Sequence, residues 1–580
     1  MFLPFLLSLI AVAIGLAAFL LTGLGPARWI QRRTGLPMAV LFPLVWVVNA
    51  LVGYAVFFCF LLGRLPGYVA AAIFLIGLSA FTIRSWRQGV FSGISGRWVK
   101  RWIALLAVAM LFFCGLLWTA SPTPRFVETV QTRYFQHLLT GDHLIPLWLA
   151  NYTLDERWGK PDTGQDALQG WLLGDRPPSQ TGIYLLYHGL YQLCGLPSTA
   201  AYQALGMVFQ LGWLPGFFLL ASRTLGPRRA GPAVALVIGL GMMVVNTAFV
   251  WPKMVCGGFI ATALALLLYR RPGRDLLILA LAAASFGLAM LSHGGALFSA
   301  PAFGLLFLMR WRGRLWQGFT VGIGVAIILL GPWTAFQKLV APPANNLLKW
   351  HLAGQRDVDR RGLTEAIQEA YADRSLADSM QARWENIATL YQHPTNQLVF
   401  GEGWLDSWRR IQFYQVIPSG GFLLLGLLAW LAAFFIRRDG AFEMWLRAGY
   451  TGPLCWAGWA LWIALLFEGG ETLTTHGSYG NLFLWFLFLI AGLMAAGRFW
   501  ALGVLALQVA AFLLLWWYPG GTLAMTQGAS WFWLPSLLAL VSYSLLIWQF
   551  GFSKIWRWGG VPVWTQTVAL PHSERNNEMG

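Results

Sequence analysis

A few titratable residues stand where proton transfer or anion binding could take place. Asp142 and His143 follow Gly141 in a long polar segment between two apolar stretches. A carboxylate held just outside an apolar stretch can be partly desolvated, which raises its basicity, and can then take a proton from a hydroxyl group. We therefore predict Asp142 as a catalytic base, with His143 as its hydrogen-bonding partner or as a group that positions the acceptor. The alternative is that Asp142 only caps a helix beginning near residue 145.

Three further residues stand at the ends of apolar stretches, and one cation precedes a proline pair. Lys253 follows Trp251-Pro252, His293 precedes two glycines, and His476 lies between two late apolar stretches. Arg176 directly precedes Pro177-Pro178. Cationic or hydrogen-bonding groups at such positions can stabilise a departing phosphate, so we predict Lys253, His293, Arg176 and His476 as phosphate-binding residues. For Lys253 the alternative is a side chain that snorkels to water.

Asp155 and Glu156 form an adjacent acidic pair, and Asp162 and Asp166 follow. Hard divalent cations such as Mg²⁺ or Mn²⁺ prefer several carboxylate oxygens. The spacing is therefore compatible with a metal site at Asp155 and Glu156, although a solvated acidic surface is the favoured interpretation.

These residues must be positioned by helices in a membrane. Apolar residues make up 57% of the chain, charged residues 11%, and the mean hydropathy is +0.60. A bilayer crossing needs about 20 mostly apolar residues, and about fifteen stretches qualify. We predict spans over 1–23, 39–63, 66–83, 103–120, 199–221, 231–249, 254–269, 276–292, 295–309, 316–334, 419–436, 445–467, 480–497, 499–517 and 531–550.

Charge is sorted between the two sets of connecting segments. Short basic loops, such as 28–33 and 270–274, alternate with three segments (121–198, 335–418 and 468–479) that carry 18 of the 23 acidic residues. Basic loops stay in the cytoplasm, so the acidic face is predicted to be the outer one. The protein is then an integral protein of the cytoplasmic (inner) membrane, with its site facing the periplasm or exterior.

The net charge of +17 does not indicate nucleic-acid binding. Most of the basic residues lie in the predicted inner loops and tail, where they follow the topology rule and attract anionic lipid headgroups. The five cysteines form no CxxC pattern or disulfide framework. The sequence also lacks the phosphate-binding GxxxxGK[ST] loop and the GxSxG and HExxH motifs, which argues against an ATP-driven pump or a soluble-type hydrolase.

The two long outer segments have helical patterns of their own. Residues 182–195 are amphipathic and too short to span, so we predict that they lie in the membrane interface. Residues 357–392 alternate acids and bases at helical spacing, which predicts a solvated helix pair.

This layout resembles the C-type (GT-C) membrane glycosyltransferases, which include protein O-mannosyltransferases and aminoarabinose transferases. The resemblance rests on the Gly141-Asp142 corner in a long first outer loop, the Pro177-Pro178 entry into an amphipathic helix, and a second long outer loop after several spans. It implies that Asp142 is the catalytic acidic residue and that the donor is a sugar on a polyprenyl phosphate. His293 stands where the family usually has lysine. The resemblance covers roughly 103–418.

The predicted fold class is therefore all-α: a polytopic transmembrane helical bundle with a GT-C-like core and two long outer-face loops. We divide the chain into N-terminal extra transmembrane helices (1–102), a seven-span core that includes the first outer loop (103–334), a second outer helical segment (335–418), C-terminal transmembrane helices (419–550) and a cytoplasmic tail (551–580).

The function favoured at this point is an inverting transfer of a sugar from a polyprenyl-phosphate donor to an envelope glycan, lipid or protein acceptor. One alternative is a polysaccharide polymerase or ligase that uses a polyprenyl-diphosphate oligosaccharide, which would place Arg409, Arg410 and His351 at its centre. Another is a transporter or flippase for lipid-linked sugars, although the predicted spans carry few of the buried ionisable groups that such proteins use. A catalytically inactive scaffold is the third alternative.

Overall fold

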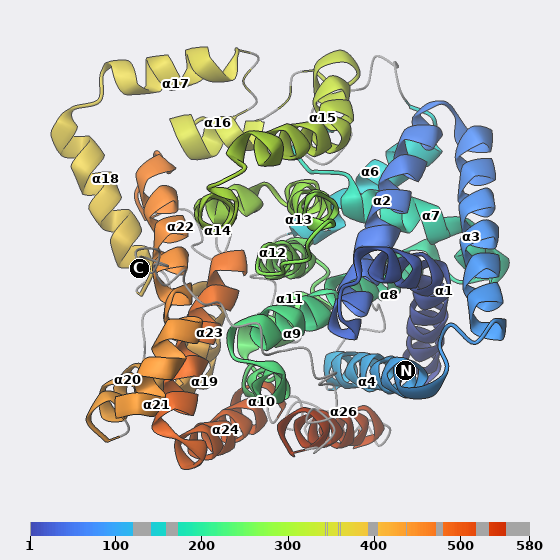
Figure 1. The fold of residues 1–580 in the computed structure, drawn as a ribbon. Coiled ribbons are helices and arrows are strands. Elements are labelled where there is room, and N and C mark those ends of the chain that lie inside the picture. The colour runs from blue at the N-terminus through green and yellow to red at the C-terminus, as the bar shows by residue number, and fades with distance from the viewer. Residues whose placement is uncertain are drawn as a thin grey trace, which may run out of the picture.

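The computed structural model describes residues 2–119, 141–157, 172–342, 344, 346–357, 359, 361–391, 404–436, 438–470, 479–517 and 533–552. Of Ile94, Asp142, Asp406 and Arg438 it describes the backbone alone. Within these residues every regular element is helical (Figure 1), which confirms the predicted all-α class.

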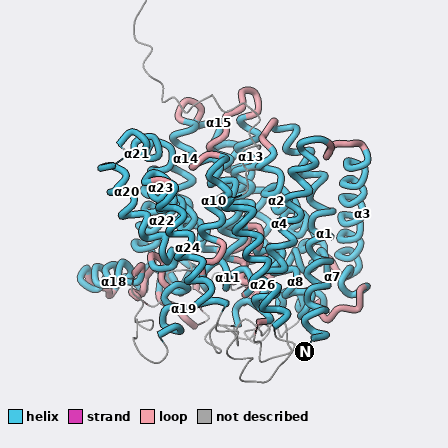
Figure 2. The backbone as a smooth tube through the Cα atoms, turned by 90° about the horizontal axis from the view of Figure 1, so that it is seen from below, coloured by secondary structure: helices cyan, strands magenta, loops and turns pink. Residues whose placement is uncertain are grey.

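Most helices run side by side along one common direction (Figure 2). Eleven described helices are long and apolar enough to cross a membrane, or up to twelve if the bent pair α10 and α11, which meet at 78°, is one span. Each of the predicted spans contains a described helix. Three of these spans contain α12, α13 and α22, which are each shorter than 18 residues. The helices that make up the bundle are α1 (Phe2–Thr34), α2 (Leu41–Leu61), α3 (Arg64–Arg87), α4 (Gly93–Trp118), α8 (Ser198–Gln210), α9 (Trp213–Thr224), α10 (Pro227–Val237), α11 (Gly241–Ala248), α12 (Lys253–Leu267), α13 (Asp275–Met290), η4 (Gly294–Ser299) with α14 (Ala300–Trp311), α15 (Leu315–Leu339), η5 (Pro418–Leu424) with α20 (Leu425–Ile436), α22 (Thr451–Leu465), α23 (Tyr479–Ala496), α24 (Arg498–Phe512) and α26 (Trp533–Ile547).

The remaining described helices lie at the two ends of the bundle or are buried beside it. They are η2 (Gly141–Leu144), α6 (Ile145–Leu154), α7 (Ser179–Leu193), α16 (Asn346–Ala353), α17 (Leu363–Ala372), α18 (Leu376–Thr389), α19 (Trp404–Tyr414) and α21 (Arg438–Met444). Four short helices, η1 (Met38–Val40), η6 (Trp445–Gly449), η8 (Leu513–Trp517) and η9 (Trp548–Phe552), directly adjoin α2, α21, α24 and α26 in the sequence.

The predicted sorting of charge corresponds to two ends of the bundle. At one end, Arg310 pairs with Asp275 at 3.0 Å and Arg274 contacts the backbone oxygen of Arg32 at 3.5 Å, which brings three basic loops together. At the other end, the three acidic segments meet. Asp175 accepts from the backbone of Asn346, and Arg356 pairs with Glu468, both at 3.0 Å. The basic-loop rule assigns the first end to the cytoplasm.

Helix α7 is not in the membrane interface, and this prediction was wrong. Its residues Ser179 to His188 are buried, and its backbone touches α2 so closely that a Cβ on Gly182 would overlap the Gly53 oxygen. Its polar face is satisfied inside the protein, since the Tyr187 hydroxyl donates to Asn49 Oδ1 at 2.5 Å. Helices α1 to α3, which the sequence predicted as an addition to the core, bury this side of α7. The division of the chain into domains stays a prediction.

The contact between α2 and α7 generates a stability prediction. Gly182→Ala should lower the thermal midpoint of the detergent-solubilised protein by several degrees, because the added methyl overlaps backbone and overpacking costs about 1–3 kcal/mol. Gly77→Ala is the matched control, since Gly77 lies within α3 and a Cβ there meets nothing within 4 Å. Equal midpoints for the two variants would contradict the close packing of α7 on α2.

Candidate active site

The candidate site is built around the sharp corner that connects α11 to α12. Val250 has a φ of 52°, a left-handed conformation that a β-branched residue rarely adopts. Trp251 and Pro252 follow, and Lys253 is the first residue of α12. A backbone strained in this way costs about 1–3 kcal/mol and persists only where its surroundings hold it.

Buried amide side chains hold this corner. Gln180 of α7 donates from Nε2 to the Val250 oxygen and to the Tyr202 hydroxyl, each at 2.7 Å. Gln210 of α8 donates to Gln180 Oε1 at 3.1 Å and accepts the N–H of Val255 at 3.0 Å. Unsatisfied polar groups are costly in such an interior, so this network both offsets the cost of its own burial and fixes the corner.

Lys253 is fully buried, at 0% exposure. Its Nζ atom lies 2.8 Å from the centre of the Trp251 ring and 5.9 Å from that of Tyr479, which begins α23. A desolvated ammonium over an aromatic face is attracted by the ring quadrupole. The side chain therefore points into the protein rather than snorkelling to water, contrary to the alternative considered from the sequence.

His293 lies between α13 and η4, close to Lys253. Its Nδ1 atom accepts the N–H of Gly295 at 3.0 Å, which leaves the proton of the neutral ring on Nε2. Burial, followed by the positive charges of Lys253 and Arg176 and by His351, holds the pKa of His293 well below its usual value. His293 is therefore a neutral imidazole that can donate a hydrogen bond from Nε2.

Arg176 is also buried, and Asp175 beside it fixes the loop that carries it. The Asp175 carboxylate accepts the N–H of Asn346 at 3.0 Å, at the start of α16, and that of Leu172 at 3.2 Å. Burial raises the pKa of Asp175, although these hydrogen bonds and Arg176 oppose the shift. The sequence analysis did not single out Asp175; its place directly before Arg176 was the available signal.

His351 of α16 completes the group. Its ring stacks on Trp350 at 5.3 Å, and its backbone oxygen accepts the N–H of Phe467 at 2.8 Å. Burial, Arg176 and Lys253 lower its pKa to about 4. Its Nδ1 atom is buried and has no hydrogen-bond partner among the described residues. The sequence placed His351 only in the alternative polymerase or ligase, whereas the structure brings it to Arg176, Lys253 and His293.

Of the proposed catalytic pair, only His143 can be placed by its side chain. The backbone of Asp142 belongs to η2, and its side chain lies outside the described part of the structure. The His143 ring is buried 4.5 Å from that of Phe249, and its backbone oxygen accepts the Tyr202 hydroxyl. Through Tyr202 and Gln180, η2 is therefore tied to the corner that carries Lys253.

The proposed metal ligands are occupied otherwise. Asp155 pairs with Arg157 at 3.0 Å, with both side chains about half exposed, and Glu156 accepts the backbone N–H of Arg64 at 2.8 Å. Among the described residues no group of three or more His, Cys, Asp or Glu side chains could hold a metal ion. Asp162 and Asp166 lie outside them, so a divalent cation stays a prediction.

The remaining predicted residues are His476, Arg409 and Arg410. His476 lies outside the described residues. Arg409 of α19 donates to the Leu515 oxygen at 2.7 Å, at the end of the span that begins with α24, and Arg410 follows it on the same helix. Arg409 thus contributes to packing of a span end.

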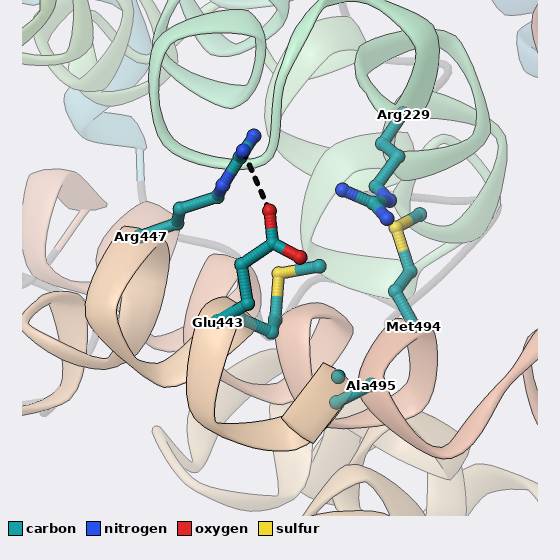
Figure 3. Close-up of a pocket in the computed structure, with 7 residues that line it drawn as sticks. Arg229, Glu443, Arg447, Met494 and Ala495 are labelled. Carbon is teal, nitrogen blue, oxygen red and sulfur yellow. Dashed lines mark ion pairs between the residues drawn. The ribbon is translucent and has the colours of Figure 1, made fainter. Parts of the chain in front are cut away.

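A cavity of about 140 Å³ lies at the opposite, basic end of the bundle (Figure 3). Arg229 and the ion pair between Arg447 and Glu443, at 2.6 Å, line it, together with Met494 and Ala495 at the inner end of α23. Tyr479 begins the same helix near Lys253, and 18 residues of helix span roughly 27 Å. This cavity is therefore separate from the candidate site.

Comparison with known proteins gave matches only among solved structures. No protein-family model and no curated protein matches the sequence. Two crystal structures of ArnT from Cupriavidus metallidurans match, one in the apo state and one bound to undecaprenyl phosphate. Each is 15% identical with a TM-score of 0.30, covering 69% or 70% of this chain and 78% or 79% of the other. A similarity at this TM-score supports no conclusion about function.

The lowered pKa of His351 predicts a pH dependence of stability. Folding favours its neutral form, so its contribution to the free energy of unfolding is present above pH 6.5 and is lost as the pH falls towards about 4. Between pH 7 and pH 5 this amounts to about 1–2 kcal/mol. His351→Gln should therefore lose less thermal stability over this interval than the unchanged protein. An equal loss in both would show that His351 is not held neutral beside Arg176, Lys253 and His293.

Proposed function

We propose that this protein is a membrane glycosyltransferase that moves a sugar from a polyprenyl-phosphate donor to a cell-envelope acceptor on the outer face. The observation that carries the proposal is the convergence of Lys253, Arg176, His293 and His351 at one end of a membrane bundle. Lys253 begins α12, His293 caps η4, and His351 lies in α16. Arg176 lies in the loop that Asp175 fixes to the start of α16, and the basic-loop rule assigns this end of the bundle to the outer side.

The residue types suit a phosphate at the lipid–water boundary. Lys253 and Arg176 are basic side chains at buried positions, where electrostatic stabilisation of an anion is stronger than in water. His293 is a neutral donor through Nε2, and His351 offers a buried Nδ1 atom. A phosphate oxygen can accept from the first three, while the fourth can pair with a hydroxyl or with a protonated oxygen.

Asp142 remains the proposed base. In an inverting transfer it would take the proton of the acceptor hydroxyl while the phosphate leaves from the opposite face of the sugar. The structure supports this only through the backbone, because η2 is tied to the corner before Lys253 by the Tyr202 and Gln180 contacts. His143, packed on Phe249, is better suited to hold η2 in place than to exchange protons.

The charge contribution of Lys253 can be measured directly. Lys253→Met should lower kcat/KM for transfer from a polyprenyl-phosphate sugar by about 10²–10³-fold, the effect of removing one group that stabilises a leaving anion. Lys338→Met is the matched control, because Lys338 lies at the same end of the bundle but is exposed. A Lys253 variant with unchanged kcat/KM would remove the proposed phosphate site.

The proposed base is tested against the alternative reaction. Asp142→Asn should abolish transfer while binding of the donor persists, whereas Arg409→Ala and Arg410→Ala should retain transfer if the fold is intact. The measurement is single-turnover transfer by protein in proteoliposomes, with thermal midpoints recorded for each variant. If Arg410→Ala abolishes transfer at an unchanged midpoint and Asp142→Asn does not, the assignment of the base is wrong and a polymerase or ligase is favoured.

A further inference from the structure

Helix α18 lies across the direction of the spans, at the edge of the molecule (Figures 1 and 2). Its start is fixed by a capping box, in which Ser375 accepts the N–H of Asp378 and the Asp378 side chain accepts the N–H of Ser375. The helix runs for 14 residues, roughly 21 Å.

One face of α18 packs on the ends of two spans. Asn386 is buried and donates to the oxygens of Ile463 and Leu466, both at 3.3 Å, at the last turn of α22. Directly after α18, the Leu390 oxygen accepts the N–H of Ile417 at 2.9 Å, just before η5 begins. The helix therefore lies at the level where α22 ends and where the span of η5 and α20 begins. By the basic-loop rule this level is the outer boundary of the membrane.

The opposite face of α18 is a stripe of large exposed apolar side chains. At 100° per residue the five positions fall within an arc of about 80°, turned away from the packed face. The stripe consists of Leu376 (79% exposed), Met380 (62%), Trp384 (61%), Ile387 (36%) and Tyr391, two residues beyond the helix end (48%). The flank between the two faces is polar, with Asp378, Gln381 and Glu385.

We propose that this stripe is embedded in the outer leaflet of the bilayer, so that α18 is an interfacial helix that lies in the membrane surface. A helix with one apolar and one polar side, lying in the interface plane, buries its apolar face at the boundary of headgroups and acyl chains. Trp384 and Tyr391 are the residue types that prefer this depth.

Lipid fits this surface better than a second copy of the chain. The span on which α18 packs, α22, also exposes a large apolar side chain, Trp456 at 46%, as expected where a bundle faces lipid. A stable dimer needs about 800 Å² on each partner, from about 20–30 residues, whereas the stripe has five residues on one helix.

The anchored helix is connected to the candidate site by hydrogen bonds, whatever reaction that site performs. The α18 side chain of Arg383 and the preceding Arg374 donate to the oxygens of Leu466 and Phe467. The Phe467 N–H in turn donates to the His351 oxygen. A helix held in the leaflet therefore fixes the segment of backbone on which α16 rests.

The test places spin labels on the two sides of α18 in the full-length protein. Cys194→Ser and Cys59→Ser remove the accessible cysteines, while the other three are buried. Met380→Cys then carries a nitroxide on the stripe, and Gln381→Cys carries the matched control about 100° away around the helix. Collision rates with oxygen and with a water-soluble nickel chelate are measured in proteoliposomes, and a second pair, Trp384→Cys and Glu385→Cys, guards against a local folding defect.

The expected result is a several-fold higher ratio of oxygen to nickel collisions at 380 and 384 than at 381 and 385. Equal ratios, with nickel reaching all four labels, would overturn the proposal and leave the stripe in water. Protection of 380 and 384 from both reagents, together with dipolar broadening between labels, would overturn it in favour of a second copy of the chain.

Discussion

The double donation by Gln180 is the contact on which the candidate site depends. Its amide nitrogen donates hydrogen bonds to the oxygen of the strained Val250 and to the Tyr202 hydroxyl. The Tyr202 hydroxyl in turn donates to the backbone oxygen of His143. Because all of these groups are buried, each unmade bond would cost its full desolvation penalty. The arrangement thus fixes the positions of α7, η2 and the start of α12 relative to one another. The position of Lys253, the first residue of α12, is fixed with them.

This arrangement of helices requires close packing at single glycines. Gly206 of α8 faces Val250, and a Cβ at that position would lie 2.7 Å from the valine Cβ. The strained corner can therefore approach α8 only where α8 lacks a side chain. Gly182 likewise allows the backbones of α7 and α2 to come into contact. The buried amides and the close helix contacts are two parts of the same constraint.

The sequence predicted those features that depend on position along the membrane normal. Lys253 and His293 come together because both stand at span ends on the side of the acidic loops, and the charge of the neighbouring loops identifies that side. His351 is brought to them by a tertiary contact, the docking of α16 on Asp175, which no local pattern encodes. Arg176, in contrast, was predicted from its place before Pro177-Pro178. The burial of α7 was missed for a related reason. A helix with Tyr184, Tyr187 and His188 among leucines has the same periodicity whether its polar face meets headgroups or, as here, the amide of Asn49.

The two histidines determine how much charge the site presents. Both are held neutral by burial and by the basic side chains beside them, so any positive charge of this group comes from Lys253 and Arg176. A phosphodiester that links a sugar to a lipid carries one negative charge, and the phosphomonoester released on transfer approaches two. In the proposed reaction, positive charge at Lys253 and Arg176 would match the departing group better than the intact donor, and interactions that strengthen towards the transition state are those that accelerate a reaction. The same reasoning explains why neutral imidazoles are useful there: they contribute hydrogen bonds without making the resting donor bind too tightly.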